Sequence, residues 1–239
     1  MRDRTRQHRV RRGLTAAIAA VALTACSSGQ GRGTGNGHGA TQVGSDGATG
    51  IGGSVLQRQI DALPKAALTP EEQKGLVRMR EVEKLAHDVY VALDATWHLQ
   101  VFSNISSAEQ THTDAVKVLI DRHALTDPAA GEAPGVFTDP ALQSLYGALV
   151  AQANASSAAA LTVGATIEDL DIADLQARAT ATADIALVYA NLEKGSRNHL
   201  RAFTKQLSSV GAMYAPTHIT QAAYDAIVAG AIERGATTG

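Results

Sequence analysis

The sequence predicts an all-α protein, a bundle of long amphipathic helices in a single domain. From about residue 55 onward, alanine, leucine and valine recur at spacings of three and four, which places them along one face of an α-helix. Alternation of β-branched and polar residues, which is typical of half-buried strands, is scarce. The stretch that shows this pattern is roughly 180 residues long, a length that suits one folded domain.

The helix boundaries follow from capping residues and from breaks in the pattern. Thr69 and Pro70, followed by two acids, are typical of a helix start, because threonine caps the first turn and proline fits its first position. We expect this helix to end at about Trp97 and Ser103 to cap the next one. Prolines and glycines between 126 and 140 indicate a long loop. The expected helices span about 70–97, 103–124, 140–153, 156–178, 181–210 and 219–234.

Residues 1–25 have the features of a secretory signal peptide. A basic segment precedes an uncharged stretch from Leu14 to Ala25, which is too short to span a bilayer. Cys26 follows and is the only cysteine, so an intramolecular disulfide is excluded. Residues 23–26 resemble a bacterial lipobox. This resemblance implies cleavage before Cys26 and a lipid on it that anchors the protein to the membrane, on the extracytoplasmic side of the bacterial envelope. An ordinary signal with an incidental cysteine is the alternative.

The segment after the signal is expected to be a tether. Residues 26–54 are mostly glycine and small polar residues, too poor in apolar side chains to build a core, so we expect a flexible link to a folded domain over 55–239. Without residues 1–25 the chain has 15 basic and 22 acidic residues, a net charge of −7. This acidic balance argues against a nucleic-acid partner but not against a cation ligand.

Acids and histidines interrupt the apolar faces of four expected helices. A buried carboxylate without a partner is costly, and solvated acids should fall on the outer face of a helix. Four carboxylates and two imidazoles that converge inside a bundle therefore predict a pair of divalent metal ions, whose four positive charges would balance the acids. The residues on these apolar faces are Glu83, Glu109, His112, Glu168, Asp171 and His199.

The pair Glu109 and His112 sets the expected metal chemistry. At a spacing of three on a helix both side chains reach the same point, and together they supply an oxygen and a nitrogen ligand. This mixture suits iron, with manganese or zinc as alternatives. Each residue also has an ordinary explanation, since an acid can lie on a solvated face and a histidine can bond to a carbonyl in the core.

Several segments resemble the helices of the ferritin-like superfamily, particularly its rubrerythrin branch. Glu83, with Ala86 three residues and Tyr90 seven residues later, resembles the first-helix motif. Glu109-x-x-His112, Glu168-x-x-Asp171 and residues 197–203 around His199 resemble those of the second, third and fourth helices. The stretch from 69 to 210 also resembles an uncharacterised bacterial and archaeal family assigned to that superfamily. The resemblance implies a ferritin-like four-helix bundle with a long crossover that carries a short helix, plus a C-terminal helix.

One position departs from the superfamily pattern. Where a glutamate is expected three residues before His199, this chain has Ser196. His87, one turn after Glu83, is a candidate to replace the missing ligand; water or substrate is the other. Two functions stay open: an envelope lipoprotein that performs oxygen or peroxide chemistry at a di-metal site, and a non-catalytic lipoprotein that buffers metal or binds a partner. The sequence does not indicate an oligomeric state.

Overall fold

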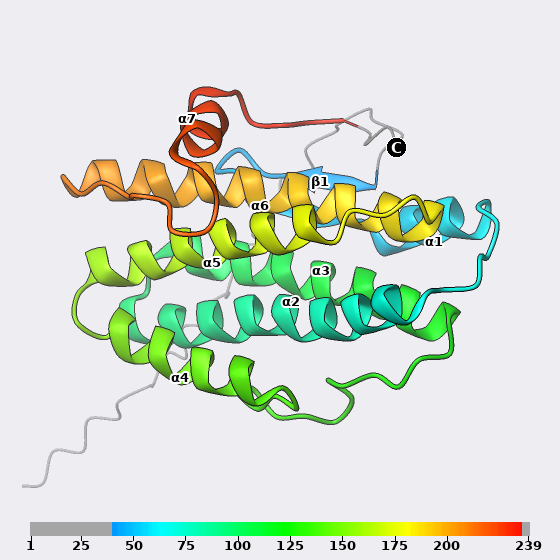
Figure 1. Cartoon of the computed structure of the whole chain (residues 1–239). Coiled ribbons are helices and arrows are strands. Elements are labelled where there is room, and N and C mark those ends of the chain that lie inside the picture. Colours follow the sequence, from blue (N-terminus) through cyan, green and yellow to red (C-terminus); the bar gives the residue numbers. More distant parts are fainter. Residues whose placement is uncertain (1–39, 236–239) are drawn as a thin grey trace, which may run out of the picture. The chain divides into compact units, whose positions relative to one another are not determined.

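The computed structural model describes residues 40–235, and these residues are mostly helical, as predicted. Four long helices pack against one another, α2 against α3 and α5 against α6, with further contacts between α3 and α6 and between α2 and α5 (Figure 1). Their apolar faces meet in one core. The bounds of these helices are Pro70–Trp97 for α2, Gln100–Arg122 for α3, Ser157–Ala177 for α5 and Ala183–Ser209 for α6.

Helix α2 begins and ends where the sequence predicted. The Thr69 hydroxyl accepts a hydrogen bond from the Glu72 amide at 3.2 Å, and the Glu72 carboxylate accepts one from the Thr69 amide at 2.8 Å. This reciprocal capping box satisfies two amides that the first turn leaves unpaired. At the other end His98 adopts a left-handed conformation with φ 51°.

The start of α3 differs from the prediction. Leu99 precedes the helix and Ser103 lies inside it, where its hydroxyl donates to the Gln100 carbonyl at 3.2 Å. The left-handed His98 turns the chain sharply, so α3 begins four residues earlier than a Ser103 cap would require. A serine one turn inside a helix bonds backward to a carbonyl, and composition alone does not separate that position from a cap.

Two shorter helices flank the long ones. Helix α4, Pro140–Ala153, follows the predicted loop and contacts α2 and α5, while α7, Gln221–Ala229, contacts α6 (Figure 1). The loop before α4 is fixed to α2, because Asp88 accepts hydrogen bonds from Lys84 and from the Gly135 amide. No helix within residues 40–235 is long and apolar enough to cross a membrane.

The predicted tether is wrong for residues 40–54. They form an antiparallel hairpin of β1, Thr41–Val43, and β2, Thr49–Ile51, and then enter α1, Gly53–Asp61. Strand β2 packs against α3 and α6 and buries Ile51, and α1 buries two further apolar side chains of its own. The segment is too short and too glycine-rich to show periodicity, yet α3 and α6 offer it a surface. The predicted signal peptide, Cys26 and the first part of the tether lie outside the described residues.

Candidate metal centre

Six of the predicted ligands lie in one buried cluster between the four long helices. Each side chain is at most 4 % exposed. Each comes from the apolar face of its helix, where the spacing of three and four residues turns it toward the other helices. The contributions are Glu83 from α2, Glu109 and His112 from α3, Glu168 and Asp171 from α5, and His199 from α6.

Glu109 lies between the two imidazoles. Its Oε2 atom is 3.0 Å from Nδ1 of His112, and its Oε1 atom is 2.8 Å from Nδ1 of His199. The two rings stack with their centroids 5.4 Å apart and their planes 18° from parallel. One carboxylate therefore reaches both histidines, with one oxygen for each.

Two further carboxylates extend this arrangement on either side. Glu83 Oε2 is 3.5 Å from Nδ1 of His112, and Glu168 Oε2 is 3.6 Å from Nδ1 of His199. The other Glu168 oxygen accepts a hydrogen bond from the Tyr90 hydroxyl at 2.6 Å. The centre thus has two halves that share Glu109: the His112 half, with Glu83, and the His199 half, with Glu168.

The two Nδ1 atoms approach these oxygens without hydrogen bonding to them. Four buried side-chain atoms of the cluster have no hydrogen-bond partner among the described residues: Oε1 of Glu83, Oδ1 of Asp171, and Nδ1 of His112 and of His199. Two ligand atoms bound at about 2.1 Å to one ion lie about 3.0 Å apart at a right angle and about 3.4 Å apart at the tetrahedral angle. The observed separations, 2.8 to 3.6 Å, match this spacing. The residues present therefore fit a metal ion.

Asp171 and Ser196 account for the departure in the fourth-helix motif. The Ser196 hydroxyl donates to Oδ2 of Asp171 at 2.5 Å, while Oδ1 has no hydrogen-bond partner in the part of the chain that the structure describes. The neighbouring Gly195 makes room for a ligand, because a Cβ atom there would lie 2.4 Å from Cε1 of His112. In place of a carboxylate, α6 contributes a hydroxyl that orients the carboxylate of α5.

Burial and mutual repulsion govern the charges of the carboxylates. Burial raises the pKa of Glu83 to about 7. It also raises the pKa of Glu168, and it raises that of Asp171 well above its usual value, with Glu83 as the largest repelling charge. Glu109 behaves oppositely: burial works against its charge, but the two histidines hold its pKa well below the ordinary value.

The carboxylates act on the histidines in return. Burial alone would lower the pKa of His112, yet Glu109 and Glu83 outweigh it and raise that pKa well above its usual value. Burial and nearby carboxylates also compete at His199, where the carboxylates raise the pKa. A second proton on His199 would occupy Nε2, the atom that accepts the Thr49 N–H group at 2.9 Å, so this hydrogen bond opposes protonation.

Thr49 is the residue of the centre that the sequence did not indicate. It is fully buried, and its amide and carbonyl contact the Nε2 atoms of His199 and His112 at 2.9 and 2.8 Å. Main-chain groups carry no residue-specific signal, and Thr49 falls in the segment predicted as a tether.

His87 does not join the cluster. Its Nδ1 atom lies 2.9 Å from Asp88, and its side chain is 25 % exposed. An adjacent carboxylate held by Lys84 and by the loop before α4 draws the ring away from Glu83, although the two residues are one helical turn apart.

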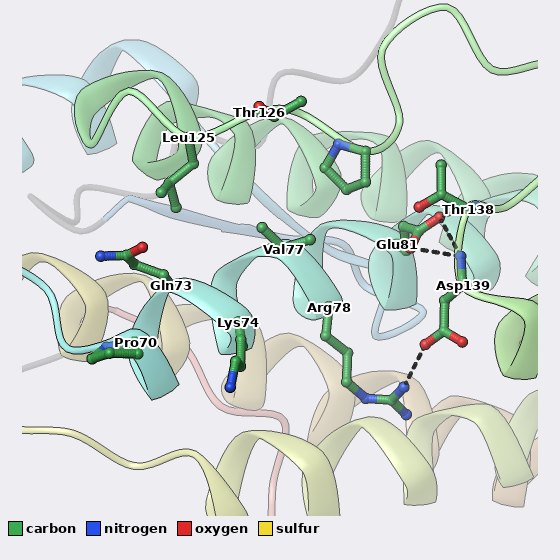
Figure 2. Close-up of a pocket in the computed structure, with 11 residues that line it drawn as sticks. Pro70, Gln73, Lys74, Val77, Arg78, Glu81, Leu125, Thr126, Thr138 and Asp139 are labelled. Atoms are coloured by element: carbon green, nitrogen blue, oxygen red, sulfur yellow. Dashed lines mark hydrogen bonds and ion pairs between the residues drawn. The ribbon is translucent and has the colours of Figure 1, made fainter.

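A surface groove lies elsewhere on the molecule. It runs between the first turns of α2 and the loop from Leu125 to Asp139 (Figure 2). Arg78 pairs with Asp139 at 3.1 Å, and Glu81 accepts hydrogen bonds from the amides of Thr138 and Asp139. None of the residues that line it belongs to the carboxylate–histidine cluster, and Arg78, Glu81 and Asp139 already have partners in the groove.

Comparison with known proteins finds a matching family and a relative of known structure. The family described as "Uncharacterized protein domain (DUF2202)" matches residues 72–231. "Uncharacterized protein MJ0754" of Methanocaldococcus jannaschii is 48 % identical over 178 residues, which cover 74 % of this chain and 96 % of the relative. The crystal structure of that hypothetical protein superposes with a TM-score of 0.71 and covers 72 % of this chain and 99 % of the other.

Proposed function

The chain belongs to the DUF2202 family, and we propose that it is a ferritin-like envelope lipoprotein that binds a pair of divalent metal ions. One observation carries the proposal: Nδ1 of His112 and Nδ1 of His199 have no hydrogen-bond partner among the described residues, yet each lies 2.8 to 3.6 Å from two buried carboxylate oxygens, which is the spacing of ligands around one ion. Without cations, four carboxylates would be held in the interior at high cost. The residues that would hold the ions are Glu83, Glu109, His112, Glu168, Asp171 and His199.

The proposed activity is redox chemistry on a small oxidant, oxygen or peroxide. Iron ions, when bound, would supply the electrons for this chemistry, and manganese is the redox-active alternative; zinc, which has no redox chemistry, would suit only the buffering function below. The chain contributes the rest. Glu109 is placed to bridge the two halves, and Tyr90 fixes the orientation of Glu168 by donating a hydrogen bond to it. Because every one of these side chains is buried, the interior also limits the access of bulk water.

Metal analysis of the purified full chain tests the proposal. We expect about two divalent ions per chain, by the charge balance of the buried carboxylates. Glu109→Gln removes the shared carboxylate charge with little change in volume, so we expect it to lose most of the metal and the consumption of peroxide. Asp114→Asn, an exposed position on the same helix, is the matched control and should keep both. A folded wild-type chain that holds less than one ion after reloading would refute the metal site.

Ser196 supports a second function, metal buffering without turnover. A hydroxyl stands where the superfamily pattern has a ligand, so α6 supplies one histidine and no carboxylate. The same variants separate the two functions. If Glu109→Gln loses both the bound metal and the consumption of peroxide, the protein is an enzyme. A wild-type chain that binds metal but consumes no peroxide indicates a buffer.

The proposed membrane anchor has its own test. Cys26→Ser removes the thiol that a lipid would modify. We expect the wild-type protein to appear in the membrane fraction with an acylated N-terminus by mass spectrometry, and the variant to lose the acyl mass. An unmodified Cys26 in the mature wild-type protein would exclude the anchor and leave the metal site unaffected.

A further inference from the structure

One peptide segment of the N-terminal hairpin contacts both histidines of the centre, and it does so with opposite polarity. The Thr49 carbonyl lies 2.8 Å from Nε2 of His112, whereas the Thr49 amide lies 2.9 Å from Nε2 of His199. A carbonyl oxygen can only accept a hydrogen bond, and an amide N–H can only donate one. Nε2 of His112 must therefore donate a hydrogen bond, whereas Nε2 of His199 must accept one.

These demands fix where each ring carries its proton. At His112 the Nε2 atom must donate, so in the neutral ring it carries the proton and Nδ1 keeps its lone pair for a cation. At His199 the Nε2 atom accepts, so in the neutral ring the proton sits on Nδ1, the atom that faces Glu109. A protonated nitrogen has no lone pair to offer a metal ion.

The hairpin is held in this position by its own turn, by α6 and by the C-terminal segment. The Thr49 hydroxyl donates to the Gly47 carbonyl at 2.8 Å and accepts from the Asn198 side chain at 2.9 Å. Asn198 is itself fixed by the C-terminal segment, since it donates to the Glu233 carbonyl and accepts from the Glu233 amide. Glu233 also pairs with Arg197 and Arg201. To displace Thr49 from His199, this network would have to shift.

The His112 half also has more buried atoms without a hydrogen-bond partner among the described residues than the His199 half. In the His112 half, Nδ1 of His112 and Oε1 of Glu83 have no hydrogen-bond partner among the described residues. In the His199 half, Tyr90 already donates to Glu168, and within residues 40–235 Nδ1 of His199 is the one atom of this half without a hydrogen-bond partner.

We infer that the two halves of the centre are inequivalent and that Thr49 is the positioning residue that makes them so. A first divalent cation binds in the His112 half, to Glu83, Glu109 and His112. A second cation binds in the His199 half only when the hydrogen bond from the Thr49 amide to His199 is broken. This inference rests on the proposed metal function and specifies the order in which that site fills.

The expected difference in affinity follows from the hydrogen bond that is lost. A buried amide left without its acceptor costs enough free energy to weaken binding by about 10- to 100-fold. Zn²⁺ titration of the metal-free full chain by calorimetry should therefore show two steps separated by that factor. His112→Gln should lose the tight step, and its matched partner His199→Gln should keep it, because the two rings are equally buried and stack on each other.

Nitrogen NMR of the metal-free chain tests the cause without metal. We expect Nε2 of His199 to appear as an unprotonated nitrogen and Nδ1 as a protonated one, with His199→Gln providing the assignment. A proton on Nε2 overturns the inference, as do two Zn²⁺ steps of equal affinity or loss of the tight step in His199→Gln; the proposed metal site would survive each of these results. A chain that binds no cation would overturn the proposed function, and the filling order with it.

Discussion

Replacing Glu83 by glutamine should stabilise the protein without metal and destabilise it with metal. Glu83 is 1 % exposed, and burial raises its pKa from 4.5 to about 7. A carboxyl group whose pKa is higher in the folded state than in the unfolded state favours folding while it is protonated. That contribution is complete below pH 4.5 and is lost as the pH rises through 7.

The size of the effect follows from the shift of about 2.5 units between those two pKa values, which corresponds to about 3 kcal/mol. Glutamine has nearly the same shape and no charge to bury. In the presence of a chelator at pH 8, we therefore expect the free energy of unfolding of Glu83→Gln to exceed that of the wild type by up to about 3 kcal/mol. At pH 4.5 the two proteins should be equally stable.

Urea denaturation of the full chain, followed by circular dichroism, measures this difference. Saturation with a divalent cation should reverse the order, because a ligand of the folded state stabilises it by mass action and the variant has lost one donor. Asp114→Asn, with an exposed side chain on α3, should follow the wild type under all conditions. A Glu83→Gln protein that is less stable than wild type at pH 8 with chelator would show that the buried charge is not costly, and the argument for a cation would fail.

Two further predictions concern single side chains. Gly195→Ala would place a methyl group 2.4 Å from the ring of His112, so it should lower the free energy of unfolding by about 1 kcal/mol even after the gain in helix propensity. Its control is Gly147→Ala, which has open space around it in the middle of α4 and should raise the free energy of unfolding by about 1 kcal/mol. Equal melting temperatures for these two variants would contradict the close contact. Thr69→Ala removes the capping bond to the Glu72 amide and should cost about 1 kcal/mol, or roughly 2–4 °C in melting temperature; an unchanged melting temperature would show that the cap is dispensable.

The long helices and six members of the cluster could be predicted because both signals are local. A carboxylate at a spacing of three or four from leucines must share their face once the segment is helical, and Glu83 and Glu109 are buried for that reason. The capping box at Thr69 is likewise complete within four residues. Such features depend on no contact between distant parts of the chain.

The parts that could not be predicted depend on contacts between distant segments or between neighbours that compete. Residues 40–54 fold because α3 and α6 present a surface to them, and no periodicity in a short glycine-rich segment reveals this. His87 has the right spacing from Glu83, but Asp88 beside it provides a nearer partner. The role of Ser196 becomes visible only when α5 brings Asp171 next to it.

Ser196 also keeps the negative charge of the centre at four, and this charge sets the number of metal ions that we propose. Glu83, Glu109, Glu168 and Asp171 carry four negative charges when ionised, which two divalent cations neutralise. A glutamate at 196 would be a fifth, at a position where the present hydroxyl approaches Asp171 to 2.5 Å. Two carboxylates at that distance repel each other and cannot both ionise without further positive charge. Because burial and Glu83 already raise the pKa of Asp171, a neutral donor is the side chain that lets Asp171 serve as a ligand.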